Sequence, residues 1–298
     1  MKFLILPILL SIFFIHEGCL DSGQNPVPLQ QNSNTLLWKV SGKELKNPSY
    51  LFGTFHLLCK DDIHFSKNLE QALKNSNEVY MELKLDDPST VFGGLLYMKM
   101  KDGKKLSDLY SPQDYARINR YFADSLKIPL SFLQDTKPYL LVALLYPRMM
   151  NCGSPTGVEE ELMKLAKQDQ KEIKGLETVQ FQASLFDSIP YRFQAKQLLD
   201  NIDSLAEYKK EFSKMVSFYK AQEIDSLQNM VSRDDFGSKH FDDLLLKDRN
   251  KRWVSILDTI MPKESVFVAV GTGHLTGPNG LISLLKHSGY HVDPVDNH

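Results

Sequence analysis

Two copies of a short motif, Gly-Thr-x-His, carry the residues of this chain that are best suited to chemistry. Gly53-Thr54-Phe55-His56 follows the apolar run 50–52, and Gly271-Thr272-Gly273-His274 follows the apolar run 266–270. A neutral imidazole is the commonest metal ligand in proteins, and a glycine turn lets the backbone bring the ring close to an ion. Ligand crevices of open α/β sheets form at the carboxyl ends of strands. We therefore expect both histidines to face one site; the alternative is that each bonds only its own turn.

Carboxylates and an arginine extend this candidate site. Glu82 ends a predicted apolar strand, where a buried carboxylate needs a cation, a hydrogen bond or a metal ion to offset its desolvation; read alone, it is equally a strand-end residue in solvent. Glu177 follows a short predicted strand; read alone, it is a charge favoured by the dipole of the next helix. Arg249 lies in a helical pattern, in which most arginines are solvated. The run Glu159–Glu161 begins another helix. We favour a favourable interaction of these charges with the helix dipole, in the first turn, over a catalytic role.

Strands and helices at the two ends of the chain must position these residues. The order strand, Gly-Thr-x-His, helix, strand occurs twice, which predicts two βαβ units and an α/β fold with a mainly parallel sheet. The predicted strands cover 37–40, 50–52, 78–83, 171–176, 266–270 and 290–295. The predicted helices begin after Ser66 and Ser111 and cover 140–150, 158–167, 179–186, a long run over 193–231, the segment around Arg249, and 281–287. We therefore expect a helical middle region, an insert at about 107–262.

Composition and charge exclude several classes of protein. The 298 residues include 42% hydrophobic and 24% charged residues, which is an ordinary globular composition. A formal net charge of -2 without a run of basic residues does not indicate a surface that binds nucleic acid. Neither histidine motif has the Gly-Lys-Ser/Thr ending of a phosphate loop, and a Gly-x-Ser-x-Gly nucleophile elbow is missing from the sequence. Nucleotide binding and serine hydrolysis are therefore set aside.

The N-terminus is typical of an export signal. Lys2 precedes an apolar run from Phe3 to Ile15, which at about thirteen residues is short for a spanning helix. Gly18-Cys19 then resembles a bacterial lipoprotein cleavage site, although His16 departs from the usual leucine. We expect residues 1–18 to be a signal peptide and 19–35 a flexible tether. The folded domain then covers 36–298, in an exported protein of the cell envelope, facing the periplasm or the cell surface. The membrane contact would be a lipid anchor at Cys19; the alternative is a soluble exported protein.

Two cysteines remain after Cys19 is assigned to the anchor. Cys59 and Cys152 can pair in an exported protein. Spacing alone does not decide between a disulfide and two buried thiols, and this question stays open at the level of sequence.

Several motifs in order along the chain resemble one known family. The chain is similar to the TraB/PrgY/GumN family, which includes the Tiki-like proteases, from about Leu37 to Val295. The resemblance rests on the two Gly-Thr-x-His tetrads, Met81-Glu82-Leu83, Gly175-Leu176-Glu177-Thr178 with Gln180, and Asp248-Arg249-Asn250.

The resemblance implies a metal-dependent hydrolase, with a peptide or protein as substrate. His56, His274 and Glu82 would hold a divalent ion, for which Zn²⁺, Mn²⁺ and Co²⁺ suit the ligands comparably well. Glu82 would then ligate the ion or act as general base, Glu177 would assist proton transfer or complete the coordination, and Arg249 would steady the anionic intermediate. The alternative function is a non-catalytic envelope protein that binds or sequesters a peptide, a metal or another ligand in the same cleft.

Overall fold

A central six-stranded sheet organises the fold in the computed structural model, which describes residues 34–232, 241 and 243–298. Its strands are β1 (Leu37–Ser41), β2 (Ser49–Thr54), β4 (Glu78–Met81), β6 (Glu172–Gly175), β7 (Val266–Gly271) and β8 (His291–Val295). The order across the sheet is β6-β4-β7-β2-β1-β8. Strands β6, β4, β7 and β2 are parallel, whereas β1 is antiparallel to both its neighbours. The predicted α/β fold with a mainly parallel sheet is confirmed.

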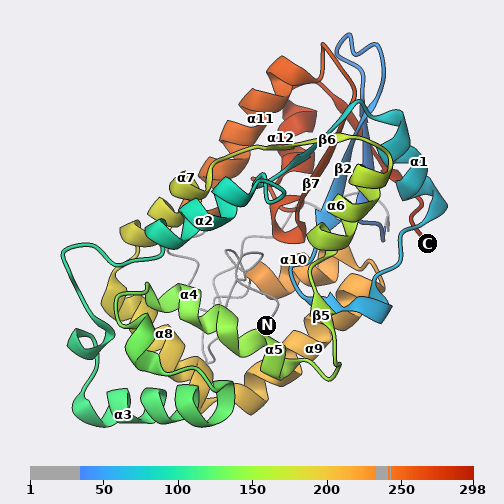
Figure 1. Cartoon of the computed structure of the whole chain (residues 1–298). Helices are drawn as coiled ribbons and strands as arrows, with labels where there is room; N and C mark the ends of the chain where they lie inside the picture. Colours follow the sequence, from blue (N-terminus) through green and yellow to red (C-terminus); the bar gives the residue numbers. More distant parts are fainter. Residues whose placement is uncertain (1–33, 233–240, 242) are drawn as a thin grey trace, which may run out of the picture.

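Helices flank the sheet and fill the middle of the chain (Figure 1). They are α1 (Lys67–Asn75), α2 (Pro88–Tyr97), α3 (Pro112–Tyr121), α4 (Pro138–Val142), α5 (Tyr146–Met149), α6 (Val158–Gln168), α7 (Val179–Leu185), α8 (Tyr191–Asp203), α9 (Leu205–Lys220), α10 (Ile224–Ser232), α11 (Asp248–Ile260) and α12 (Leu281–His287). The long helical run predicted over 193–231 consists of three helices, α8, α9 and α10. One break lies at Gln222, which has a φ of 55° and uses its side chain to bind the backbone of Leu36 and Asn297.

The two predicted βαβ units leave the centre of the sheet in opposite directions. From β2 the chain passes through α1 to β4, with β7 between the two strands. From β7 it passes through α12 to β8, beyond β2 and β1. Because such crossovers are right-handed, the two helices lie on opposite sides of the strands (Figure 1). The carboxyl ends of β2 and β7 therefore form a topological switch point, where α/β proteins bind ligands.

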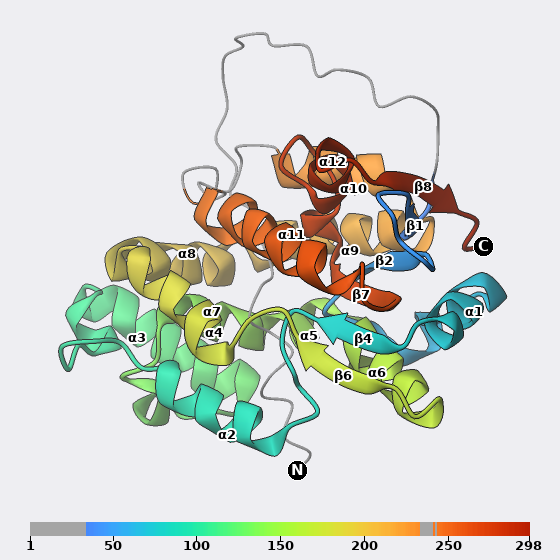
Figure 2. The same ribbon diagram turned by 90° about the horizontal axis from the view of Figure 1, so that it is seen from above.

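The helical middle has a hydrophobic core of its own beside the end of the sheet (Figure 2). Buried side chains from several helices and their connections form it, among them Leu106, Ile118, Phe122, Leu130, Leu145 and Leu198. Leu57 and Leu83, each one residue after a candidate site residue, join the same core. The predicted insert also supplies β6 to the sheet, and α6 and α11 pack against the sheet core. The candidate site thus lies between two hydrophobic cores.

A disulfide ties the loop after β2 to the start of α6. Cys59 and Cys152, 93 positions apart, are bonded, with their Cα atoms 5.8 Å apart. Cys59 ends the short strand β3 (Leu58–Cys59), which pairs with β5 (Pro155–Thr156). The bond and this small ladder hold the segment after His56 against the segment that leads into α6.

Candidate metal centre

His56, Glu82 and His274 come together at the switch point of the sheet. They follow β2, β4 and β7 respectively, and the parallel strands bring these ends to one edge. A carbon atom added to the Cα of Gly271 would lie 3.2 Å from Glu82 Oε1, 3.6 Å from His56 Nε2 and 3.8 Å from His274 Cδ2. The three side chains therefore line one small volume, which the absence of a side chain at Gly271 leaves open.

The ring of His56 is held from behind by Glu159. Nδ1 lies 2.7 Å from Glu159 Oε1, and a carboxylate only accepts hydrogen bonds. Nδ1 therefore carries the proton, and Nε2 is the nitrogen that faces the open volume. Burial lowers the pKa of His56, but the charge of Glu159 and its hydrogen bond outweigh burial and raise the pKa to about 9. A cation that binds at Nε2 has to displace a proton.

His274 also carries a proton on Nδ1, which a neutral partner accepts. Its Nδ1 lies 2.7 Å from Asn250 Oδ1, while the Asn250 amide nitrogen donates to Asn279 O at 2.8 Å. On the other side of the ring, Arg249 Nη1 stands 3.0 Å from Nε2. A guanidinium only donates, so Nε2 presents a lone pair. Burial and the charge of Arg249 lower the pKa of His274 to about 3, which keeps this imidazole neutral.

Arg249 is a fully buried cation at the centre of the site, with 0% of its surface exposed. Its guanidinium donates to Glu177 at 3.0 Å, to Glu82 at 2.7 Å and to the carbonyl of Leu245 at 3.0 Å, besides the contact with His274. Burial raises the pKa of Glu82, but the charge of Arg249, the neighbouring histidines and a hydrogen bond from the Gly271 amide outweigh burial and lower the pKa to about 2. Arg249 therefore keeps Glu82 ionised and fixes its orientation.

Glu177 and Gln182 support the arginine rather than facing the open volume. Glu177 accepts from Trp253 Nε1 at 3.2 Å in addition to its contacts with Arg249. Gln182 bridges the two carboxylates, donating to Glu82 at 3.1 Å and to Glu177 at 3.0 Å. The resemblance had singled out Gln180, but that residue is exposed on α7. The position of Gln182, on the buried side of the helix with Val179 and Ala183, is the signal that could have identified it.

The position of Glu159 at the start of α6 predicts a charge in the first turn of that helix. In the structure the side chain is buried against His56. The signal was present in the helical spacing, because positions 159, 162, 163 and 166 lie on one face of α6. The other three are Leu162, Met163 and Ala166. A glutamate in an apolar stripe needs a buried partner, and here the partner is His56.

The donor set fits a divalent cation. His56 Nε2, His274 Nε2 and Glu82 Oε1 are the N and O ligands that Zn²⁺, Mn²⁺ and Co²⁺ accept, and each histidine donates its other ring proton to an oxygen, as metal-ligating histidines do. Within 34–232, 241 and 243–298, no group of three or more His, Cys, Asp or Glu side chains already stands at metal-ligand spacing. Arg249 must give up its contact with His274 Nε2 before an ion binds there.

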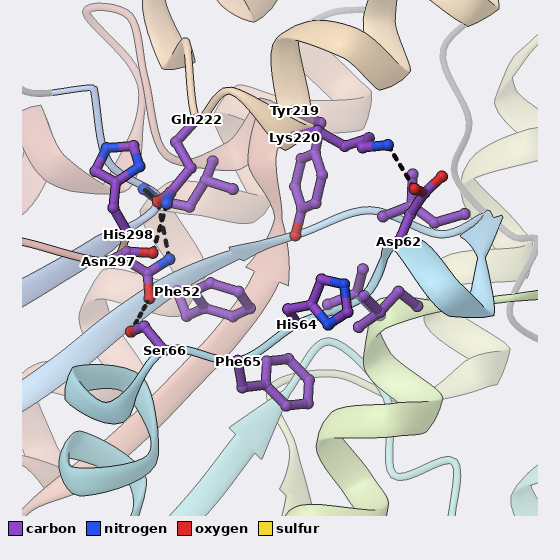
Figure 3. Close-up of a pocket in the computed structure, with 14 residues that line it drawn as sticks. Phe52, Asp62, His64, Phe65, Ser66, Tyr219, Lys220, Gln222, Asn297 and His298 are labelled. Atoms are coloured by element: carbon purple, nitrogen blue, oxygen red, sulfur yellow. Dashed lines mark hydrogen bonds and ion pairs between the residues drawn. The ribbon is translucent and has the colours of Figure 1, made fainter.

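A separate cavity of about 440 Å³ is lined by residues of β2, of the segment 62–66 and of the end of α9 (Figure 3). Phe52, Phe65 and Tyr219 line it, and the Tyr219 hydroxyl donates to the carbonyl of Gly53 at 2.9 Å. The lining residues do not include any of the candidate site residues His56, Glu82, Glu177, Arg249 and His274. A side chain of the cavity wall, Tyr219, thus contacts the backbone of the first tetrad.

The chain belongs to the TraB/PrgY/gumN family, whose model matches residues 36–294. The chain is 23% identical to "Metalloprotease TIKI1" of Danio rerio over 89% of its own length and 64% of the relative's. Identity to "Metalloprotease TIKI1" of Homo sapiens is 24%, over 89% and 63% of the two chains. Identity to "Uncharacterized protein YbaP" of Shigella flexneri is 24%, over 80% and 88%. The chain thus spans less than two thirds of the length of the TIKI1 relatives. No solved structure matches it.

The described helices include none that is long and apolar enough to cross a membrane. The predicted signal peptide and Cys19 lie outside the described residues.

Proposed function

We propose that this chain is a metal-dependent hydrolase that cleaves peptide bonds. The observation that supports this function best is the convergence of His56 Nε2, His274 and Glu82 Oε1 on the volume beside Gly271. Family membership agrees with it, since two of the relatives described above carry the name metalloprotease.

The residues divide into ion ligands and residues that act on charge and orientation. His56, His274 and Glu82 would hold the ion, which when bound supplies an activated water and polarises the substrate carbonyl. Glu177 holds Arg249, and we assign it this positioning role in place of proton transfer because its oxygens already bind donors. Arg249 lends its positive charge to the site, where it stabilises negative charge that develops on the carbonyl oxygen.

The place of action in this proposal is the cell envelope. A disulfide such as Cys59–Cys152 persists in an oxidising compartment, in agreement with the apolar run and Gly18-Cys19 at the N-terminus. If Cys19 carries the lipid, replacing it with alanine removes the lipid from the chain, which mass spectrometry of the membrane-extracted protein detects. An unmodified wild-type Cys19, or a chain retained in the cytoplasm, would refute the anchor.

The function is tested by cleavage of a peptide library with and without a chelator. We expect wild-type protein to cleave, chelation to abolish cleavage, and added Zn²⁺, Mn²⁺ or Co²⁺ to restore it. His274→Ala should remove activity, while His64→Ala, which changes a histidine of the separate cavity, should not. Peptide binding that survives chelation, with no peptide cut by any variant, would instead identify a sequestering protein.

A further inference from the structure

Three consecutive glutamates at the start of α6 meet different partners. Glu160 and Glu161 both pair with Lys164, at 3.1 Å and 2.7 Å, on the surface of the helix. Glu159 turns the other way, and only 9% of its side-chain surface is exposed. A buried carboxylate is unfavourable unless it is paired, so the partners of Glu159 indicate its role.

The contacts of Glu159 converge on one oxygen. Oε1 accepts from His56 Nδ1 at 2.7 Å and from the Thr54 hydroxyl at 2.6 Å. Both partners belong to the first Gly-Thr-x-His tetrad, so the carboxylate joins the threonine and the histidine of one motif. The spacing from Thr54 to His56 thus places two donors side by side for a single acceptor.

The backbone at the start of α6 is docked on the same turn. The amide of Val158 donates to the carbonyl of Phe55 at 3.0 Å. A carbon atom added to Gly157 would stand 3.0 Å from the carbonyl oxygen of His56 and 3.0 Å from Glu159 Oε2. Glycine at this position lets the helix approach the turn closely, and the glutamate is therefore placed by main-chain contacts as well as by its own hydrogen bonds.

We propose that Glu159 is a positioning residue that fixes the rotation of the His56 ring and the proton on Nδ1, so that Nε2 is presented to Glu82 and His274. The second histidine has an amide partner instead, Asn250. The two histidines are therefore held by partners of different charge, and only His56 gains electron density from a carboxylate. The effect on metal affinity rests on the proposed function; the positioning of the ring does not.

The positioning is tested on the full chain without metal, by NMR of the ring proton on His56 Nδ1. His56→Gln identifies the resonance. We expect a downfield, slowly exchanging proton in wild type and in the matched control Glu161→Gln, which changes the same charge two positions away. In Glu159→Ala the resonance should be lost, and in the near-isosteric Glu159→Gln it should move upfield and exchange faster. A wild type without this proton, or an unchanged resonance in Glu159→Ala, would overturn the assignment.

A second arm measures binding of Zn²⁺ by calorimetry in the same proteins. Affinity should fall about 10–100-fold in Glu159→Gln, the usual effect of removing a partner of a ligating histidine, and should be unchanged in Glu161→Gln. Equal losses in both variants would refute the link to the metal. A wild type that binds no divalent ion would refute the proposed function, while the NMR result would still decide the role of Glu159.

Discussion

Replacing Arg249 with alanine should destabilise the fold as well as impair the site. The guanidinium is completely buried between Glu82 and Glu177. Without it, these two carboxylates share a buried space with no cation between them. Removing one partner of a buried ion pair costs about 3–5 kcal/mol, because the remaining charge is left uncompensated. From the sequence alone, Arg249→Ala is expected to keep the metal and slow turnover; the structure adds this loss of stability.

Urea unfolding followed by circular dichroism at pH 7 measures the loss. With a slope of about 1–3 kcal/mol per molar urea, the midpoint should fall by at least about 1 M. The double variant Arg249→Ala with Glu177→Gln should recover part of the stability, since it removes one of the uncompensated charges.

Arg252→Ala is the matched control for this prediction. Arg252 is exposed one turn from the same buried network and stacks on the ring of Phe181, with 3.9 Å between its guanidinium carbon and the ring centre. Its loss should cost no more than about 1 kcal/mol. If Arg249→Ala destabilises the protein no more than this control does, the buried ion network does not hold the site together.

Two further predictions concern other parts of the fold. Replacing Cys59 and Cys152 with serine should lower the free energy of unfolding by about 2–5 kcal/mol; thermal unfolding against wild type checks this, and equal transition temperatures would refute it. Asp187 pairs with the buried Lys137 at 2.9 Å, and although burial opposes it, hydrogen bonds from Tyr191 and Lys137 lower the pKa of Asp187 below its ordinary value of 3.8. Its ionised form therefore stabilises the fold above about pH 4, and this stability is lost as the pH falls. Asp187→Asn should have a lower free energy of unfolding than wild type at pH 7, and this difference should narrow as the pH falls below about 4; a constant difference would refute this.

The sheet could be predicted because its signals are local. An apolar run that ends in Gly-Thr-x-His predicts a strand, a turn and the position of the histidine within a few residues. Its repetition predicts a shared site. The short strand that leads to Glu177 was visible for the same reason. The order of the strands in the sheet was harder to predict. The position of β7 between β2 and β4 depends on the direction in which each crossover connection leaves its strand.

Partnerships between distant residues could not be predicted from local patterns. Glu159 and His56 are 103 positions apart. The apolar stripe of α6 indicates that Glu159 is buried, but it does not identify His56 as the partner. The helix break at Gln222 could not be predicted because no glycine or proline lies at this position. The Gln222 side chain is held by hydrogen bonds to the backbone of Leu36 and Asn297, near the two ends of the described chain. In each case tertiary contacts outweigh the local preference of the segment.

The most direct measurement of the central claim is a calorimetric titration of Zn²⁺, Mn²⁺ and Co²⁺ into metal-free wild type, His56→Ala, His274→Ala and Glu82→Gln. We predict that wild type binds one ion per chain and that each variant binds it at least about tenfold more weakly, a loss of about 1.4 kcal/mol or more. Equal affinity in all four proteins would contradict the assignment of these three side chains as the ligands of a metal centre.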